Sequence, residues 1–202
     1  PSDAHGVELT PLNRRFETNR ITYEHLSIEL EPSASAAYIT IHGPKEAPPS
    51  SPVGLRASFW PLALARELDD AILHLRFNDD EIGTWVFRTL GDNGLVEAMD
   101  RFLHENADDW LVREIILHLK RTLKRLDVSS RSLITLIEPG SCFSGTLIEV
   151  ALASDRTYML DGTFEGSGIS AASIRLSPLN FGALPMVNGL SRLESRFLTT
   201  PE

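Results

Sequence analysis

The sequence predicts an α/β domain with a mixed, mostly parallel sheet flanked by helices. Short segments with strand-like alternation are separated by longer segments whose apolar residues recur at helical spacing, and parallel strands need crossover connections of this kind. The chain has 202 residues, of which 42% are hydrophobic, and a chain of this size buries about 70% of its unfolded surface in one core. We therefore expect one domain over residues 21–202, preceded by a polar linker over residues 1–20.

The expected strands follow from local patterns. Apolar and polar residues alternate over residues 26–30, as in a half-buried strand. A second strand, residues 37–42, ends at Gly43-Pro44, and four prolines make residues 44–52 irregular. Three more short apolar segments are expected to be strands: residues 84–89, 133–137 and 157–160.

The expected helices follow from wider apolar spacing. Leucine and isoleucine recur every three or four residues between 64 and 75, and Pro61 fits the first turn because that turn needs no N–H. A longer helix is indicated by the apolar residues between 111 and 126, with Asp108 as its N-cap. Two shorter helices are expected, at residues 145–153 and 190–197.

Charge and composition exclude several function classes. The net charge of −9 repels phosphate backbones, so we expect no nucleic-acid partner. No apolar run approaches the roughly 20 residues of a spanning helix, so we expect no membrane segment. A single cysteine excludes a disulfide framework and a multi-cysteine zinc site, and it is compatible with the reducing cytoplasm, where we expect the protein. One basic cluster is interpreted as a solvated helix end: Lys120, Arg121, Lys124 and Arg125.

Common catalytic signatures are missing from the sequence. His104-Glu105 lacks the second histidine of a zinc-protease motif, and neither a P-loop nor a dinucleotide fingerprint occurs. Cys142, after Gly140-Ser141, could be half of a nucleophile elbow, but that elbow needs glycine where Ser144 stands. It also needs a downstream histidine, and all six histidines precede residue 119. Cys142 is therefore better interpreted as a small buried hydrophobe.

Glu149 is the most informative residue. It is the only charge in the segment LIEVALA, residues 147–153, which is otherwise apolar on every side and therefore buried. A buried carboxylate is costly unless it is paired or protonated, and a carboxyl with a shifted pKa suits acid–base catalysis. The other interpretation is that Glu149 is paired with an arginine or points to solvent.

Three stretches resemble the crotonase (enoyl-CoA hydratase/isomerase) superfamily. Residues 132–160 give a strand, a small-residue turn, a helix with Glu149 and Ala151, and Asp155 before a strand. Residues 181–185 (FGALP), with the later Ser191-Arg192-Leu193, resemble its Gly-x-x-Pro and Arg-Leu stretch, and residues 39–45 resemble its opening strand. The resemblance covers residues 21–197 and implies a crotonase-like ββα superhelix.

The resemblance also implies site residues. Glu149 takes the place of the first catalytic glutamate of enoyl-CoA hydratases. The backbone N–H groups of Gly145 and Thr146 take the place of one side of the oxyanion hole, which stabilises charge on the thioester oxygen. Pro178 stands where the second glutamate would be, and the loop at residues 91–94 offers no clear second donor. We therefore expect the complete site to lie in a missing half, with the residues here forming a degenerate copy. The alternative is that Glu149 still reaches a shared active site.

Four phrases narrow the resemblance to one branch of the superfamily. These phrases are WPLALARELDDAILHLRFND, GTWVFRTLGD, DVSSRSLITLIEPGSCF and ASDRTYM. They resemble the second crotonase-like half of enzymes that open 2,3-epoxybenzoyl-CoA with water, without oxygen or metal, to give 3,4-dehydroadipyl-CoA semialdehyde and formate. No cofactor is implied, because CoA is part of the substrate.

The branch also implies partners for the chain. These are an acyl-CoA substrate, an upstream crotonase-like half joined through residues 1–20, and a homo-oligomer. One alternative stays open at this point. In it, the chain is a degenerate, non-catalytic crotonase-like scaffold or dimerisation domain.

Overall fold

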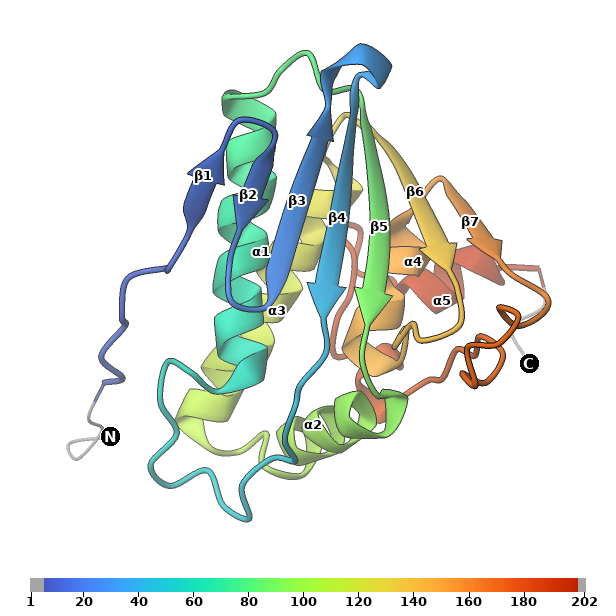
Figure 1. The fold of residues 1–202 in the computed structure, drawn as a ribbon. Helices are drawn as coiled ribbons and strands as arrows, with labels where there is room; N and C mark the ends of the chain where they lie inside the picture. The colour runs from blue at the N-terminus through green and yellow to red at the C-terminus, as the bar shows by residue number, and fades with distance from the viewer. Residues whose placement is uncertain (1–5, 200–202) are drawn as a thin grey trace.

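Seven strands form one mixed sheet in the computed structural model, which describes residues 6–199 (Figure 1). The strands lie in chain order, with antiparallel pairs from β1 to β4 and parallel pairs from β4 to β7. This arrangement confirms the expected mixed α/β sheet. The strands are β1 Arg15–Glu17, β2 Arg20–Thr22, β3 Leu26–Glu31, β4 Ala36–His42, β5 Thr84–Leu90, β6 Ser132–Ile137 and β7 Arg156–Met159.

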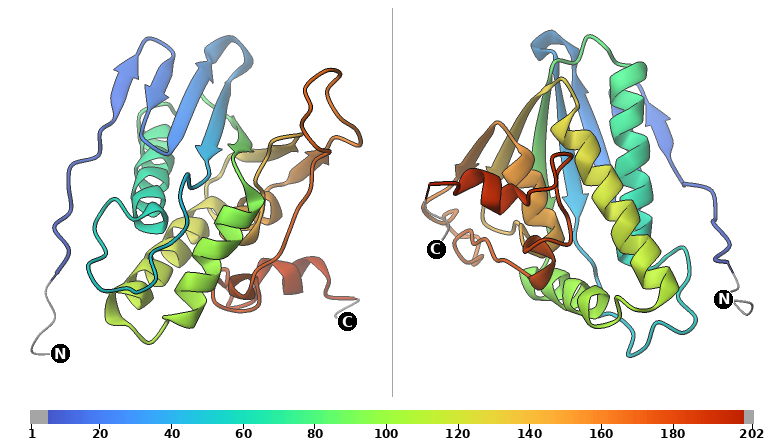
Figure 2. Two further views of the ribbon diagram at one scale, coloured as in Figure 1. Left: turned by 60° about the horizontal axis from the view of Figure 1, so that its bottom comes forward. Right: turned by 180° about the vertical axis from the view of Figure 1, so that it is seen from behind.

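Helices α1, α3 and α4 pack against the same face of the sheet, as the view from behind shows (Figure 2). The opposite face is more polar, since Ser27 and Glu29 of β3 point away from the buried Leu26 and Ile28. Trp85 and Phe87 of β5 are fully buried. The helices are α1 Trp60–Phe77, α2 Asn93–Glu105, α3 Trp110–Asp127, α4 Ile148–Ala153 and α5 Arg192–Arg196, with 3-10 turns η1 Pro32–Ala34, η2 Gly145–Leu147 and η3 Pro178–Asn180.

Two details differ from the sequence-based expectations. The expected linker contains β1, which forms a hairpin with β2 and extends the sheet, so the polar lead ends before residue 15. Asp109, not Asp108, caps α3, because its carboxylate accepts hydrogen bonds from the N–H groups of Leu111 and Val112 at 2.9 and 3.1 Å. Asp108 has the same side chain, so the path of the backbone decides which of the two aspartates caps the helix.

The basic cluster on α3 is less solvated than expected. Arg125 Nε lies 2.8 Å from Asp69 Oδ1 of α1, and Arg121 Nη2 lies 3.7 Å from Asp69 Oδ2. These ion pairs tie α3 to α1. None of the helices within residues 6–199 combines the length and the apolar character that crossing a membrane requires.

Candidate functional site

The turn before α4 is closed around the carboxylate of Asp100. Thr146 donates to it twice, from its N–H at 2.6 Å and from Oγ1 at 2.7 Å, and Ser177 Oγ donates at 2.7 Å. Gly145 has a φ of +49°, and a Cβ there would overlap Asp100 Oδ2. Only glycine therefore fits beside this carboxylate.

Asp100 is almost completely buried on α2, with 1% of its surface exposed. Burial raises the pKa of Asp100 to about 6, because desolvation outweighs the hydrogen bonds that favour the anion. Nearby negative charge on Glu149 acts in the same direction as burial. The group thus titrates just below neutral pH inside the protein.

Glu149 is also buried, with 1% exposed, and both carboxylate oxygens have partners. Asn180 Nδ2 donates to Oε1 at 2.6 Å, and Arg192 Nη1 donates to Oε2 at 2.8 Å. Burial raises the pKa of Glu149 even though these bonds favour its charged form. Of the two interpretations of Glu149, the structure therefore shows the one in which it is paired with an arginine.

Arg192 connects three parts of the chain. Its guanidinium bonds to Glu149 of α4, to both oxygens of Asp127 at the end of α3 at 3.0 and 2.8 Å, and to the carbonyl of Leu184 at 3.2 Å. Only 1% of Arg192 is exposed. Together with Asn180, it holds the C-terminal segment, residues 177–196, against α3 and α4.

The two backbone donors expected at the oxyanion position are both occupied. Thr146 N–H donates to Asp100, and Gly145 N–H donates to the carbonyl of Arg175 at 3.0 Å. The loop after β5 is engaged as well, since Gly91 N–H donates to the carbonyl of Gly140 at 3.2 Å and Asp92 caps α2. A thioester oxygen could reach the N–H of Thr146 only by displacing Asp100.

Cys142 and Pro178 show no catalytic arrangement. Cys142 is fully buried, and its Sγ fills the space between Gly43 and Gly91. Burial raises the pKa of the Cys142 thiol to about 11, which disfavours the thiolate that a nucleophile needs. Pro178 is exposed at the start of η3, while the amide of Asn180 occupies the position beside Glu149.

A pocket of about 650 Å³ lies beyond the C-terminal end of β4. Ligands of α/β sheets commonly bind at this end of the strands. Lys45 and Arg56 supply positive charge, and Phe59 and Trp60 supply aromatic surface. Its lining also includes His25, Met99 and two carboxylates, those of Glu24 and Glu46.

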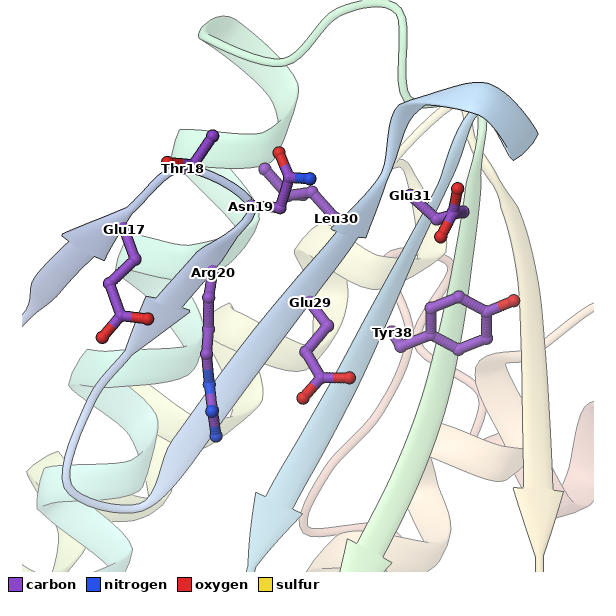
Figure 3. Close-up of a pocket in the computed structure, with 8 residues that line it drawn as sticks. All are labelled: Glu17, Thr18, Asn19, Arg20, Glu29, Leu30, Glu31 and Tyr38. Atoms are coloured by element: carbon purple, nitrogen blue, oxygen red, sulfur yellow. The ribbon is translucent and has the colours of Figure 1, made fainter.

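A second pocket, of about 500 Å³, lies at the β1–β2 hairpin (Figure 3). Its side chains include Glu17, Glu29 and Glu31 but only one cation, Arg20. Such a lining repels phosphate groups. Of these two pockets, the one beside Lys45 suits an anionic ligand better.

Sequence reasoning missed the acceptor that closes the turn. Asp100 lies on α2 between the buried residues Val96, Met99 and Leu103, so it is a charged residue within an apolar stripe. This is the same signal that singled out Glu149. It would have marked Asp100 as a second buried carboxylate.

Comparison with known proteins places these observations in context. No family model matches the chain. Benzoyl-CoA-dihydrodiol lyase from Aromatoleum evansii is 46% identical over 200 residues, which cover 98% of this chain. The chain spans about a third (35%) of the length of that relative.

One solved structure supports the fold with a TM-score above 0.5. An enoyl-CoA hydratase/isomerase from Bordetella parapertussis matches 86% of this chain and 60% of its own, with a TM-score of 0.53 and 17% identity. An enoyl-CoA hydratase from Shewanella pealeana matches 66% of this chain and 46% of its own, with a TM-score of 0.46 and 15% identity. The chain therefore has a crotonase-like fold, and nearly its whole length is similar in sequence to a third of a benzoyl-CoA-dihydrodiol lyase.

Proposed function

We propose that the chain is part of a lyase that opens the ring of a benzoyl-CoA derivative. The observation that supports this most is the 46% identity to a benzoyl-CoA-dihydrodiol lyase over 98% of the chain. The crotonase-like fold agrees with a CoA-thioester substrate. In the proposed reaction, 2,3-epoxybenzoyl-CoA consumes two molecules of water, one to open the epoxide and one in the cleavage of the ring carbon–carbon bond. The products are 3,4-dehydroadipyl-CoA semialdehyde and formate, formed in the cytoplasm with no cofactor beyond the CoA of the substrate.

Within this lyase, we assign Glu149, Gly145 and Thr146 to positioning rather than to catalysis. Both oxygens of Glu149 and both backbone N–H groups are bonded inside the protein. A general acid or base must reach a substrate proton, and an oxyanion donor must face the developing charge. The reacting groups then lie on the rest of the enzyme, in the upstream crotonase-like half expected from the resemblance.

The rest of the enzyme, or a second copy, has a suitable surface on which to pack. Twelve of the nineteen large exposed hydrophobic side chains within residues 6–199 belong to residues 158–198. Tyr158 and Met159 lie on β7, the last strand at one edge of the sheet. Exposed apolar side chains that form a continuous patch are typical of a protein interface, and we propose that those of residues 158–198 take part in one.

The pocket beside Lys45 is the proposed place where this chain meets the CoA thioester. Lys45 and Arg56 can bind phosphate groups, while Phe59 and Trp60 offer apolar contact. Calorimetry of the full chain with benzoyl-CoA tests this assignment. We expect binding that Lys45→Ala weakens at least threefold and that Lys120→Ala, on the far helix α3, leaves unchanged. If the full chain gives no heat of binding with benzoyl-CoA, this part of the enzyme does not bind the CoA thioester.

The lyase assignment is tested on the complete protein that contains this chain. We expect it to release formate from 2,3-epoxybenzoyl-CoA, and the absence of formate refutes the assignment. Glu149→Gln should keep kcat and its pH profile per folded molecule, because a positioning residue exchanges no proton with the substrate. Its free energy of unfolding should fall, since the single amide oxygen of glutamine can replace only one of the two acceptors that Asn180 and Arg192 use. A loss of a hundredfold or more would restore a catalytic role to Glu149, since acid–base groups contribute about that much.

A further inference from the structure

Glu67 of α1 is a buried carboxylate without a cationic partner among the described residues. Only 4% of Glu67 is exposed. Its oxygens accept hydrogen bonds from the backbone N–H groups of Glu24 and His25 at 3.3 and 2.8 Å, and no salt bridge within residues 6–199 includes it. Two amide donors satisfy a carboxylate only in part, because they carry no full charge.

His25 brings an unused ligand atom to the same place. It lies in the turn between β2 and β3, which Figure 1 shows beside α1. Its Nε2 is buried without a hydrogen-bond partner among the described residues. A histidine ring nitrogen is an ordinary metal ligand in proteins.

Glu24 completes a set of three. One ligand atom from each of Glu24, His25 and Glu67 lies within 4.8 Å of the other two. A tetrahedral Zn²⁺ with bonds of about 2.0–2.2 Å holds its ligand atoms roughly 3.4 Å apart. Glu24 is exposed, so its side chain can rotate to bring its carboxylate closer to the other two ligand atoms.

We propose that Glu24, His25 and Glu67 form a binding site for a divalent transition-metal ion such as Zn²⁺. Two carboxylates and one imidazole are ordinary ligands for such an ion. A bound divalent ion would neutralise the charge of the Glu67 carboxylate and would be held by a ring nitrogen of His25. Three protein ligands also leave a fourth position, and Glu24 and His25 line the pocket beside Lys45. The inference does not depend on the proposed lyase function.

Calorimetry of the full chain with ZnCl₂, after treatment with a chelator, tests the site. We expect one equivalent of Zn²⁺ to bind, and His25→Ala and Glu24→Gln each to weaken binding at least tenfold. His104→Ala is the matched control, because His104 is an exposed histidine on α2 far from this cluster in sequence. No binding by the unaltered chain, or equal binding by His25→Ala, overturns the proposal.

A spectroscopic measurement separates metal binding from folding. Glu67→Gln also alters the acceptor of two backbone hydrogen bonds, so circular dichroism must show that this variant is folded. We expect Co²⁺ added to the unaltered chain to give visible absorption of a low-coordinate ion. His25→Ala and Glu67→Gln should each abolish that absorption, and its persistence in either folded variant contradicts the assigned ligands.

Discussion

Replacing Arg192 with methionine should remove a large part of the stability of the protein. The substitution keeps most of the buried volume but leaves Glu149 without its only cationic partner in the described structure. Asp127 loses the same partner. Removing one member of a buried ion pair costs about 3–5 kcal/mol, because the remaining charge is uncompensated.

The structure sets where in this range the effect lies. The side chains of Arg192 and Glu149 are each 1% exposed, so water cannot replace the lost bond. Asp127 is 13% exposed and is partly hydrated after the substitution. Glu149 can also take up a proton, since burial already raises its pKa. We therefore expect a loss of about 4 kcal/mol in the free energy of unfolding at pH 7, near the middle of that range.

Urea denaturation followed by circular dichroism measures this loss. For a chain of this size, about 4 kcal/mol corresponds to a decrease in Tm of roughly 8–16 °C. Arg175→Met is the matched control, because Arg175 forms a more exposed ion pair with Glu97 and should cost at most about 1 kcal/mol. The double variant Arg192→Met with Glu149→Leu should recover part of the loss. If Arg192→Met costs no more than Arg175→Met, the buried network does not hold the C-terminal segment.

Three further predictions concern the turn before α4. Asp100→Asn should weaken the pH dependence of stability: folding raises the pKa of Asp100 from 3.8 to about 6, so this carboxyl by itself lowers the stability of the unaltered chain by about 2 kcal/mol between pH 4 and pH 7, and urea denaturation of both chains at both values checks the difference. Gly145→Ala should destabilise the chain by more than about 2 kcal/mol, because its Cβ would meet Asp100 at a positive φ; a smaller change means that the turn can rearrange. Cys142 should react with a thiol reagent at pH 8 far more slowly in the native chain than in urea, because the side chain is buried and burial raises the pKa of its thiol to about 11. Equal reaction rates in the two conditions would contradict the burial of Cys142.

The fold was predictable where local pattern and tertiary packing agree. Helix α1 has apolar residues at regular spacing and Pro61 in its first turn, and both features report the same element. The β1–β2 hairpin lacks such agreement. Each strand has three residues, and Phe16 of β1 is 54% exposed. Its pairing depends on β3, which no local pattern reveals.

The candidate site was predictable only in part, for a related reason. The apolar surroundings of Glu149 in sequence correctly indicate that its carboxyl is buried, because a helix that is apolar on all sides packs inside. The residue that pairs with Glu149 could not be predicted in this way. Arg192 lies 43 residues away and reaches Glu149 only because η3 and α5 fold back over α4. Local spacing cannot identify a contact of this range.

A backbone turn of the expected shape does not by itself supply the expected chemistry. The turn from Gly145 to Leu147 leads into α4, which carries Glu149. The carboxylate of Asp100 accepts the hydrogen bond of the Thr146 N–H. A thioester oxygen that displaced this carboxylate would leave it buried with fewer donors, at a cost of several kcal/mol. That cost would cancel the few kcal/mol that an oxyanion donor contributes to a rate. The turn therefore serves to join α2, α4 and the C-terminal segment, and in the proposed lyase the chemistry takes place where donors are free to face the substrate.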